Sequence, residues 1–185
     1  MILPPPQIQT LIGLLRNGAR LDGRSLFEYR EISFAFPQGT TNENGGSCIV
    51  KLGANSVLAR VSCEVMEPKP FRPSQGMLFV NFDASTLVHL EDSRSTSKVV
   101  RAAEEEGRRL SAILQIILRD TIDLDALCIV AWERVFAIRL ELRALSFDGN
   151  LGDCGALASI MALSTYKRPD VVVTDEGKAS FLSRL

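Results

Sequence analysis

Residues 147–163 contain the best candidates for chemistry in this chain. They predict the end of a strand, a tight turn at Asp148-Gly149-Asn150 and a helix rich in small and aliphatic side chains. Such a helix N-terminus offers unpaired N–H groups and a positive dipole end, which together can bind a phosphate. This turn, however, supplies the carboxylate of Asp153 and no Lys, Arg, Ser or Thr. We expect Asp153 to cap the helix and to repel an anion, so the side chains argue against a phosphate site.

The other reactive residue types give no catalytic or metal-binding pattern. The cysteines are far apart and form no C-x-x-C pair, so we predict no zinc site and thiols that behave as small buried hydrophobes in a reducing compartment. They are Cys48, Cys63, Cys128 and Cys154. His89 is the only histidine, and no Ser or Cys nucleophile is suggested beside it. We therefore predict no catalysis at His89, no metal and no cofactor.

Composition indicates an ordinary globular chain. Its 185 residues suffice for one domain, or for one domain with part of another. The net charge of −1 gives no global basic field, so any RNA contact must be local or shared with partner subunits. The N-terminus lacks the pattern of a signal peptide, and no apolar run approaches the roughly 20 residues of a membrane span. We predict an intracellular, soluble protein.

The hydrophobic pattern predicts the elements that must position the turn. Apolar residues at helical spacing predict helices, at residues 8–17, 93–119 and 153–166. Alternating or continuous apolar runs predict strands, at residues 31–36, 47–52, 57–66, 77–82, 127–132 and 134–145. Val171-Val172-Val173 begins another strand, for which we expect no later partner. From this we predict a sequence that is cut within or just before a second layer of the fold.

The order of these elements and several short motifs resemble the RNase PH family, and within it the inactive ring subunits of the eukaryotic RNA exosome. Arg20-x-Asp22-Gly23-Arg24 looks like the N-terminal motif of the family. Other matching segments are residues 48–53, 61–64, 127–131, 148–150 and 168–171. The resemblance implies an α+β fold that is RNase PH-like (ribosomal protein S5 domain 2-like), a β-sheet packed with helices, apparently truncated at the C-terminus. The implied divisions are an N-terminal helix and turn at 1–27, RNase PH domain 1 at 28–168 and the start of a second RNase PH domain at 169–185.

In active members of that family, a Thr-Arg pair in this turn binds the attacking phosphate. The matching positions in this chain are Asn150, Leu151, Gly152 and Asp153. Both the hydroxyl and the guanidinium are absent, and an arginine is the side chain that binds phosphate in a bidentate, charge-assisted way. The aspartate pair of active relatives likewise has no match in Asp170 and Asp175. The resemblance therefore implies a subunit without catalytic activity.

The resemblance also implies partners and a place in the cell. The partners are the other RNase PH-like subunits of a hexameric ring, cap subunits with RNA-binding domains, and single-stranded RNA that passes through the complex, with no membrane. The complex carries out 3′→5′ RNA processing and degradation, including that of rRNA, in the nucleus with its nucleolus and in the cytoplasm. Candidate RNA-binding residues in this chain are Lys69, Arg72, Arg94, Lys98 and Arg101.

Plainer interpretations remain open for these residues. Lys69 and Arg72 can be ordinary charges on a solvated loop, and Glu104-Glu105-Glu106 interrupts the basic residues of the long helix, as on a solvated face. Trp132 stands where the family usually has glycine, and we predict a core or interface residue rather than a base-stacking platform. Two other functions also remain: an active phosphate-dependent 3′→5′ exoribonuclease resembling RNase PH, and a fold relative with no RNA role.

Overall fold

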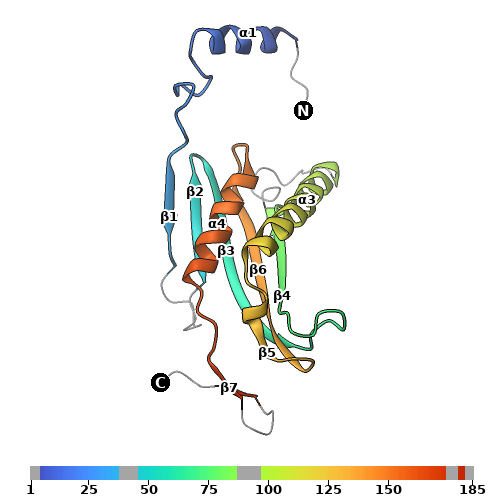
Figure 1. Cartoon of the computed structure of the whole chain (residues 1–185). Helices are drawn as coiled ribbons and strands as arrows, with labels where there is room; N and C mark the ends of the chain where they lie inside the picture. The colour runs from blue at the N-terminus through green and yellow to red at the C-terminus, as the bar shows by residue number, and fades with distance from the viewer. Residues whose placement is uncertain (1–4, 38–45, 87–96, 174–178, 182–185) are drawn as a thin grey trace. The chain divides into compact units, whose positions relative to one another are not determined.

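The computed structural model describes residues 5–37, 46–86, 97–173 and 179–181 (Figure 1). The chain divides into two compact units, an N-terminal unit of Met1–Glu31 and a main unit of Ile32–Leu185. Helix α1 (Pro5–Arg16) belongs to the N-terminal unit and confirms the helix predicted there. It ends before Gly18, whose φ of 77° is the left-handed conformation that commonly terminates a helix. The domain divisions at residues 27 and 168 stay a prediction.

The main unit is built on a mixed β-sheet in the order β1-β2-β3-β6-β4, with β5 paired to β6. The strands are β1 (Ile32–Ala35), β2 (Ser47–Leu52), β3 (Asn55–Met66), β4 (Met77–Asp83), β5 (Cys128–Val130) and β6 (Arg134–Ser146). Neighbouring strands run antiparallel except β4, which is parallel to β6. A parallel pair needs a crossover connection, and helix α3 (Ser97–Thr121) lies in that connection. The short 3₁₀ helix η1 (Asp125–Leu127) then leads into β5.

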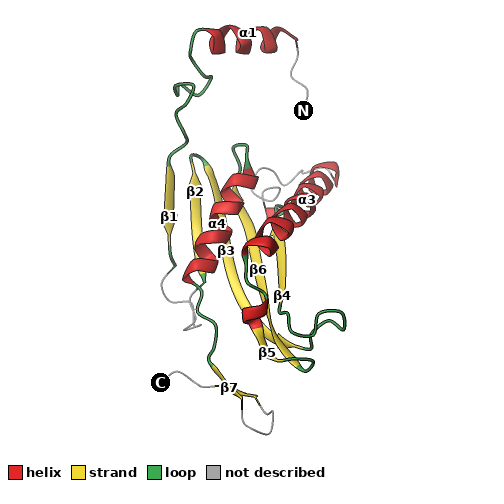
Figure 2. Ribbon diagram, in the orientation of Figure 1, coloured by secondary structure: helices red, strands yellow, loops and turns green. Residues whose placement is uncertain are grey.

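One face of the sheet is apolar and is covered by two helices. Val57, Ala59 and Val61 of β3 are buried and alternate with the less buried Leu58 and Arg60, as the period of a strand requires. Helix α4 (Leu151–Thr165) lies along β2 and β3, and α3 lies along β4 (Figure 2). The opposite face is polar and includes an ion pair between Arg139 Nε and Glu64 Oε2 at 3.0 Å. This arrangement confirms the α+β fold, with the core between the sheet and the helices.

The two edges of the sheet differ in how they are closed. On β4, the N–H groups of Val80 and Phe82 donate to Gln115 Oε1 (2.8 Å) and Ser111 Oγ (2.7 Å) of α3. Side chains of the helix therefore satisfy the outer edge of β4, as a neighbouring strand would. On β1, the side chains of Ile32, Phe34 and Phe36 are 38 to 46% exposed. These side chains are more exposed than those of a half-buried strand, because an edge strand has a neighbouring strand on one side only.

Two glycines let the helices approach the sheet closely. A Cβ added at Gly107 of α3 would lie 2.6 Å from the carbonyl oxygen of Phe82. A Cβ added at Gly155 of α4 would lie 2.6 Å from the Phe82 ring. Real Cβ atoms do not approach so closely, so α3 needs a glycine where it packs against the backbone of β4, and α4 needs one where it packs against the Phe82 side chain.

The C-terminal segment corrects one prediction. Strand β7 (Val171–Val173) pairs antiparallel with β8 (Ala179–Phe181), so the expectation that no later strand would pair with it was wrong. A strand of three residues is too short to show an alternating pattern, which is why the sequence did not reveal β8. Within the described parts of the chain, no helix is long and apolar enough to cross a bilayer.

The cysteines are free, with Cys48 and Cys154 buried and Cys63 and Cys128 half-buried. Among the described residues, no group of His, Cys, Asp or Glu side chains could hold a metal ion. The Cys154 thiol lies 3.5 Å from the carbonyl oxygen of Val50 and donates to it. Burial raises the pKa of the Cys154 thiol to about 11.

We expect Cys154 to react with iodoacetamide much more slowly than Cys128 in the native protein. The thiolate is the reactive form, and each unit of pKa lowers its fraction about tenfold at about pH 8. Peptide mapping by mass spectrometry after timed labelling measures both rates. In urea the difference should disappear, whereas equal native rates would contradict the burial of this thiol.

Candidate functional site

The turn between β6 and α4 forms the predicted phosphate loop, and its cap differs from the prediction. Asn150 is the N-cap residue, in the left-handed conformation at φ 65° and ψ 55°. Its Oδ1 accepts from the N–H of Asp153 at 3.4 Å, and its Nδ2 donates to Oδ2 of Asp153 at 2.5 Å. Asp153 is therefore not the cap. The Asn150 amide has both an acceptor and a donor, and Asn tolerates the left-handed region better than most residues.

The geometry of this loop is unfavourable for an anion. The Asn150 side chain already occupies one of the N–H groups that a phosphate would use. The exposed carboxylate of Asp153 adds negative charge in the first turn of α4. Leu151 is 5% exposed and packs into the core, and Gly152 has no side chain. The loop thus has the backbone of an anion site but carries neither a cation nor a hydroxyl.

Asn55 positions this loop. The residue is fully buried at the start of β3. Its Nδ2 donates to the carbonyl of Gly149, and its Oδ1 accepts from the N–H of Asp148 at 2.6 Å. No local sequence pattern indicates this role, because both hydrogen-bond partners lie more than 90 residues away in the chain. A single amide side chain therefore fixes the conformation of the turn before α4.

A hollow of about 910 Å³ lies next to the loop, between α3 and α4. Most of its lining is apolar, including Leu110, Ile113 and Phe147. Arg109 also lines it, but its Nη2 is paired with Oε1 of Glu106 at 2.6 Å. The hydrogen bond from Arg109 holds the pKa of the Glu106 carboxyl below its usual value and raises the pKa of Arg109. The arginine that lines this hollow is therefore paired with a carboxylate of its own helix.

The structure does not bring the candidate RNA-binding residues together. Lys69 and Arg72 lie on the loop between β3 and β4, where they line a hollow of about 80 Å³ with Gln115 and Arg119. Arg101 is exposed near the other end of α3, about 20 Å away along the helix axis. Arg94 lies outside the described residues, and so does the side chain of Lys98 in the first turn of α3.

Among the described candidates, Arg101 therefore lies apart from Lys69 and Arg72. Sequence reasoning missed Arg119, because helical spacing alone does not show which loop faces the last turn of α3.

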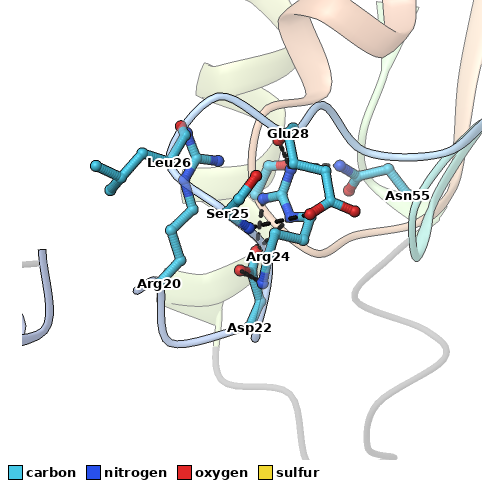
Figure 3. Close-up of polar contacts among 8 residues, drawn as sticks. Arg20, Asp22, Arg24, Ser25, Leu26, Glu28 and Asn55 are labelled. Atoms are coloured by element: carbon cyan, nitrogen blue, oxygen red, sulfur yellow. Dashed lines mark hydrogen bonds and ion pairs between the residues drawn. The ribbon is translucent and has the colours of Figure 1, made fainter. Parts of the chain in front are cut away.

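The Arg20-x-Asp22-Gly23-Arg24 motif forms a turn in the N-terminal unit with hydrogen bonds among its own residues and those that follow it (Figure 3). Arg24 Nε donates to Asp22 Oδ2 at 2.8 Å, and its Nη1 donates to the carbonyl of Glu28 at 3.1 Å. The side-chain hydrogen bond from Arg24 lowers the pKa of the Asp22 carboxyl. Arg20 donates to the carbonyl of Leu26. Both arginines thus bond to the turn itself, so this motif has a structural role within its own unit.

Comparison with known protein families identifies the family of this chain. Residues 28–169 match the RNase PH family model, described as 3′ exoribonuclease family, domain 1. The chain is therefore a member of the RNase PH family.

The similar proteins are named as exosome components. The chain is 37% identical over 167 residues to Exosome complex component RRP45 of Danio rerio, covering 88% of this chain and 39% of that protein. It is 38% identical over 167 residues to RRP45 of Homo sapiens, covering 88% of this chain and 35% of that protein. It is 31% identical over 176 residues to Exosome complex component Rrp42 of Methanothermobacter thermautotrophicus, covering 94% and 62%. The chain thus spans less than two-fifths of the length of these two RRP45 proteins.

A solved structure has the same fold. The Archaeoglobus fulgidus exosome with RNA bound to the active site contains a chain that matches with a TM-score of 0.72 and 30% identity. The match covers 87% of this chain and 61% of that one. An RNase PH-like fold, with a mixed sheet packed against helices, is thereby shown for this protein.

Proposed function

We propose that this chain is a non-catalytic structural subunit of an RNA exosome ring, in which other subunits carry out the chemistry. The observation that carries this proposal is the turn before α4, where Asn150 and Asp153 close the helix N-terminus to an anion. Phosphorolysis requires a bound phosphate, and removing even one preorganised donor from an oxyanion site costs about 10²- to 10³-fold in rate. The names of the relatives support the ring as the setting. A finer assignment, to the place of the ring subunit called exosome component 9, belongs to the same proposal.

The partners proposed are other RNase PH-like subunits, cap subunits with RNA-binding domains and single-stranded RNA. The complex would support 3′→5′ RNA processing and degradation in the nucleus, including the nucleolus, and in the cytoplasm. Residues 28–168 would form RNase PH domain 1, after the N-terminal helix and turn at 1–27, and residues 169–185 would begin a second such domain. Within the chain, Lys69 and Arg72 remain candidates for RNA contact because their loop is exposed. Arg94, Lys98 and Arg101 are a separate group of candidates.

Ring membership is tested by purifying the tagged chain from its native cells and identifying the proteins that accompany it by mass spectrometry. We expect recovery of the other RNase PH-like proteins of the ring together with cap subunits. Recovery of the chain only with copies of itself would instead favour the alternative, an active phosphate-dependent 3′→5′ exoribonuclease.

Catalytic inactivity is tested by incubating the purified chain with oligoadenylate and inorganic phosphate and measuring nucleoside diphosphates by chromatography. We expect no phosphate-dependent release above the rate without protein, while an active RNase PH enzyme gives a positive control. Release by the unaltered chain that disappears in an Asn150→Ala variant would refute the proposal and place catalysis at this loop.

A further inference from the structure

Trp132 has an unusual backbone conformation and an exposed side chain. It lies in the turn between β5 and β6 with a φ of 72°, in the left-handed region that favours glycine. Its side chain is 72% exposed, so of the two predicted roles, core or interface residue, the core is excluded and the interface stays a prediction. The left-handed conformation costs free energy, and an exposed side chain gains little packing energy to offset that cost. Residues with such strained backbones cluster at functional sites. The position therefore presents an indole ring to a ligand or partner.

A second exposed ring lies on a loop that is bonded to this turn. Phe71, in the loop between β3 and β4, is 95% exposed. The N–H of Trp132 donates to the carbonyl of Pro73 in that loop at 3.0 Å. The N–H of Gly76, at the end of the loop, donates to the carbonyl of Leu124 at 2.9 Å. Three prolines also restrict the backbone, since each fixes its φ angle: Pro68, Pro70 and Pro73. The backbone that carries both rings is thus held in place, which lowers the backbone entropy lost on binding.

The same loop carries the cations. Lys69 and Arg72 line the hollow of about 80 Å³, and Arg119 reaches it from the last turn of α3. No Asp or Glu is among the described residues that line this hollow. Its volume equals about two to three water molecules at roughly 30 Å³ each, the size of a phosphate group rather than of a nucleotide. The hollow therefore suits one phosphate of a polyanion.

We propose that Phe71, Trp132, Lys69, Arg72 and Arg119 form one binding surface for single-stranded RNA, which we call the aromatic–basic surface. Bases stack on the two rings, and a phosphate lies at the hollow lined by the three cations. Proteins that bind single strands without reading sequence combine exposed rings with basic residues in this way. The choice of RNA as the ligand rests on the proposed function. The two rings and Arg119 go beyond the residues that the sequence suggested.

The single tryptophan of the chain makes stacking directly measurable. We expect oligouridylate to quench the fluorescence of the full chain saturably, because the signal comes from Trp132 alone. Binding of labelled oligouridylate, followed by anisotropy, should weaken about 5- to 150-fold in Trp132→Gly, the range of a lost base–aromatic stack. Trp132→Phe should retain most of the affinity. Glycine suits the left-handed backbone, so the Trp132→Gly variant should melt at the same temperature or higher.

The phosphate contact is tested by the salt dependence of binding. Each lost contact to a single strand lowers the slope of log affinity against log salt by about 0.7. We expect this change in Arg119→Gln and none in Arg108→Gln, which removes an equally exposed arginine from α3 outside the hollow.

Two results would overturn the proposal: no quenching by RNA, or equal RNA affinity of Trp132→Gly and the unaltered chain. If Trp132→Gly with unchanged RNA affinity also lost a ring protein, the surface would be a protein contact. Quenching by RNA without co-purification of ring subunits would refute the proposed function but support the RNA-binding surface. Co-purification of ring subunits without quenching would refute the RNA-binding surface but support the proposed function.

Discussion

Replacing Asn55 by alanine is expected to lower the free energy of unfolding by about 2–4 kcal/mol, because two buried hydrogen bonds are lost. The carbonyl of Gly149 loses its donor and the N–H of Asp148 loses its acceptor. Neither group gains a partner from the methyl group of alanine. An unsatisfied buried group costs about 1–3 kcal/mol, which is more than the mean value of a hydrogen bond.

The measurement is urea denaturation followed by circular dichroism. Asn81→Ala is the matched control, because Asn81 is an exposed asparagine on β4 and its loss should cost less than about 0.5 kcal/mol. Hydrogen exchange adds a local readout, since the Asp148 amide should exchange faster in Asn55→Ala. If the two variants were equally stable, Asn55 could not be what fixes the turn before α4.

Gly107→Ala should lower the free energy of unfolding by about 1–3 kcal/mol, whereas Gly152→Ala should raise it by up to about 1 kcal/mol. The new methyl group at Gly107 would lie 2.6 Å from the Phe82 carbonyl oxygen, which is backbone and cannot rotate away. Helix α3 would have to move from β4 and strain the bonds of Ser111 and Gln115 to that strand. At Gly152 the new methyl group would meet Leu110 at an ordinary 3.5 Å, so the better helix propensity of alanine remains.

Thermal and urea unfolding of both variants measure whether the free energy of unfolding falls in Gly107→Ala and rises in Gly152→Ala. Both substitutions add one methyl group to a helix, so each controls for the other. A stabilising Gly107→Ala would contradict the close approach of α3 to β4 at this glycine.

Most helices and strands could be predicted from the sequence, because they depend on the spacing of residues that are close together in the chain. The helical spacing of apolar residues predicted α1, α3 and α4, and alternation predicted β3 and β6. The turn before α4 was found from Asp148-Gly149-Asn150, where Gly149 and Asn150 adopt the left-handed conformation. The short strand β8 was missed because three residues carry no period.

Only part of each candidate site could be predicted from the sequence. The residue types at the phosphate loop showed that the cation and the hydroxyl were absent, but they did not show that Asn150 rather than Asp153 caps α4. The basic residues were identified, but not the distance along α3 that separates Arg101 from Lys69 and Arg72. Arg119 and Asn55 gave no signal, since their partners lie far away in the chain.

The sequence by itself determined the elements, the α+β class and the lack of a phosphate-binding side chain in the turn, because these follow from residue type and short-range spacing. The tertiary structure decided which side chains meet. Asn55 reaches the turn before α4 because β3 pairs with β6, and Trp132 lies beside the loop of Lys69 and Arg72 because its N–H bonds to Pro73. Such contacts depend on strand register and helix packing, and no local pattern of residues encodes them.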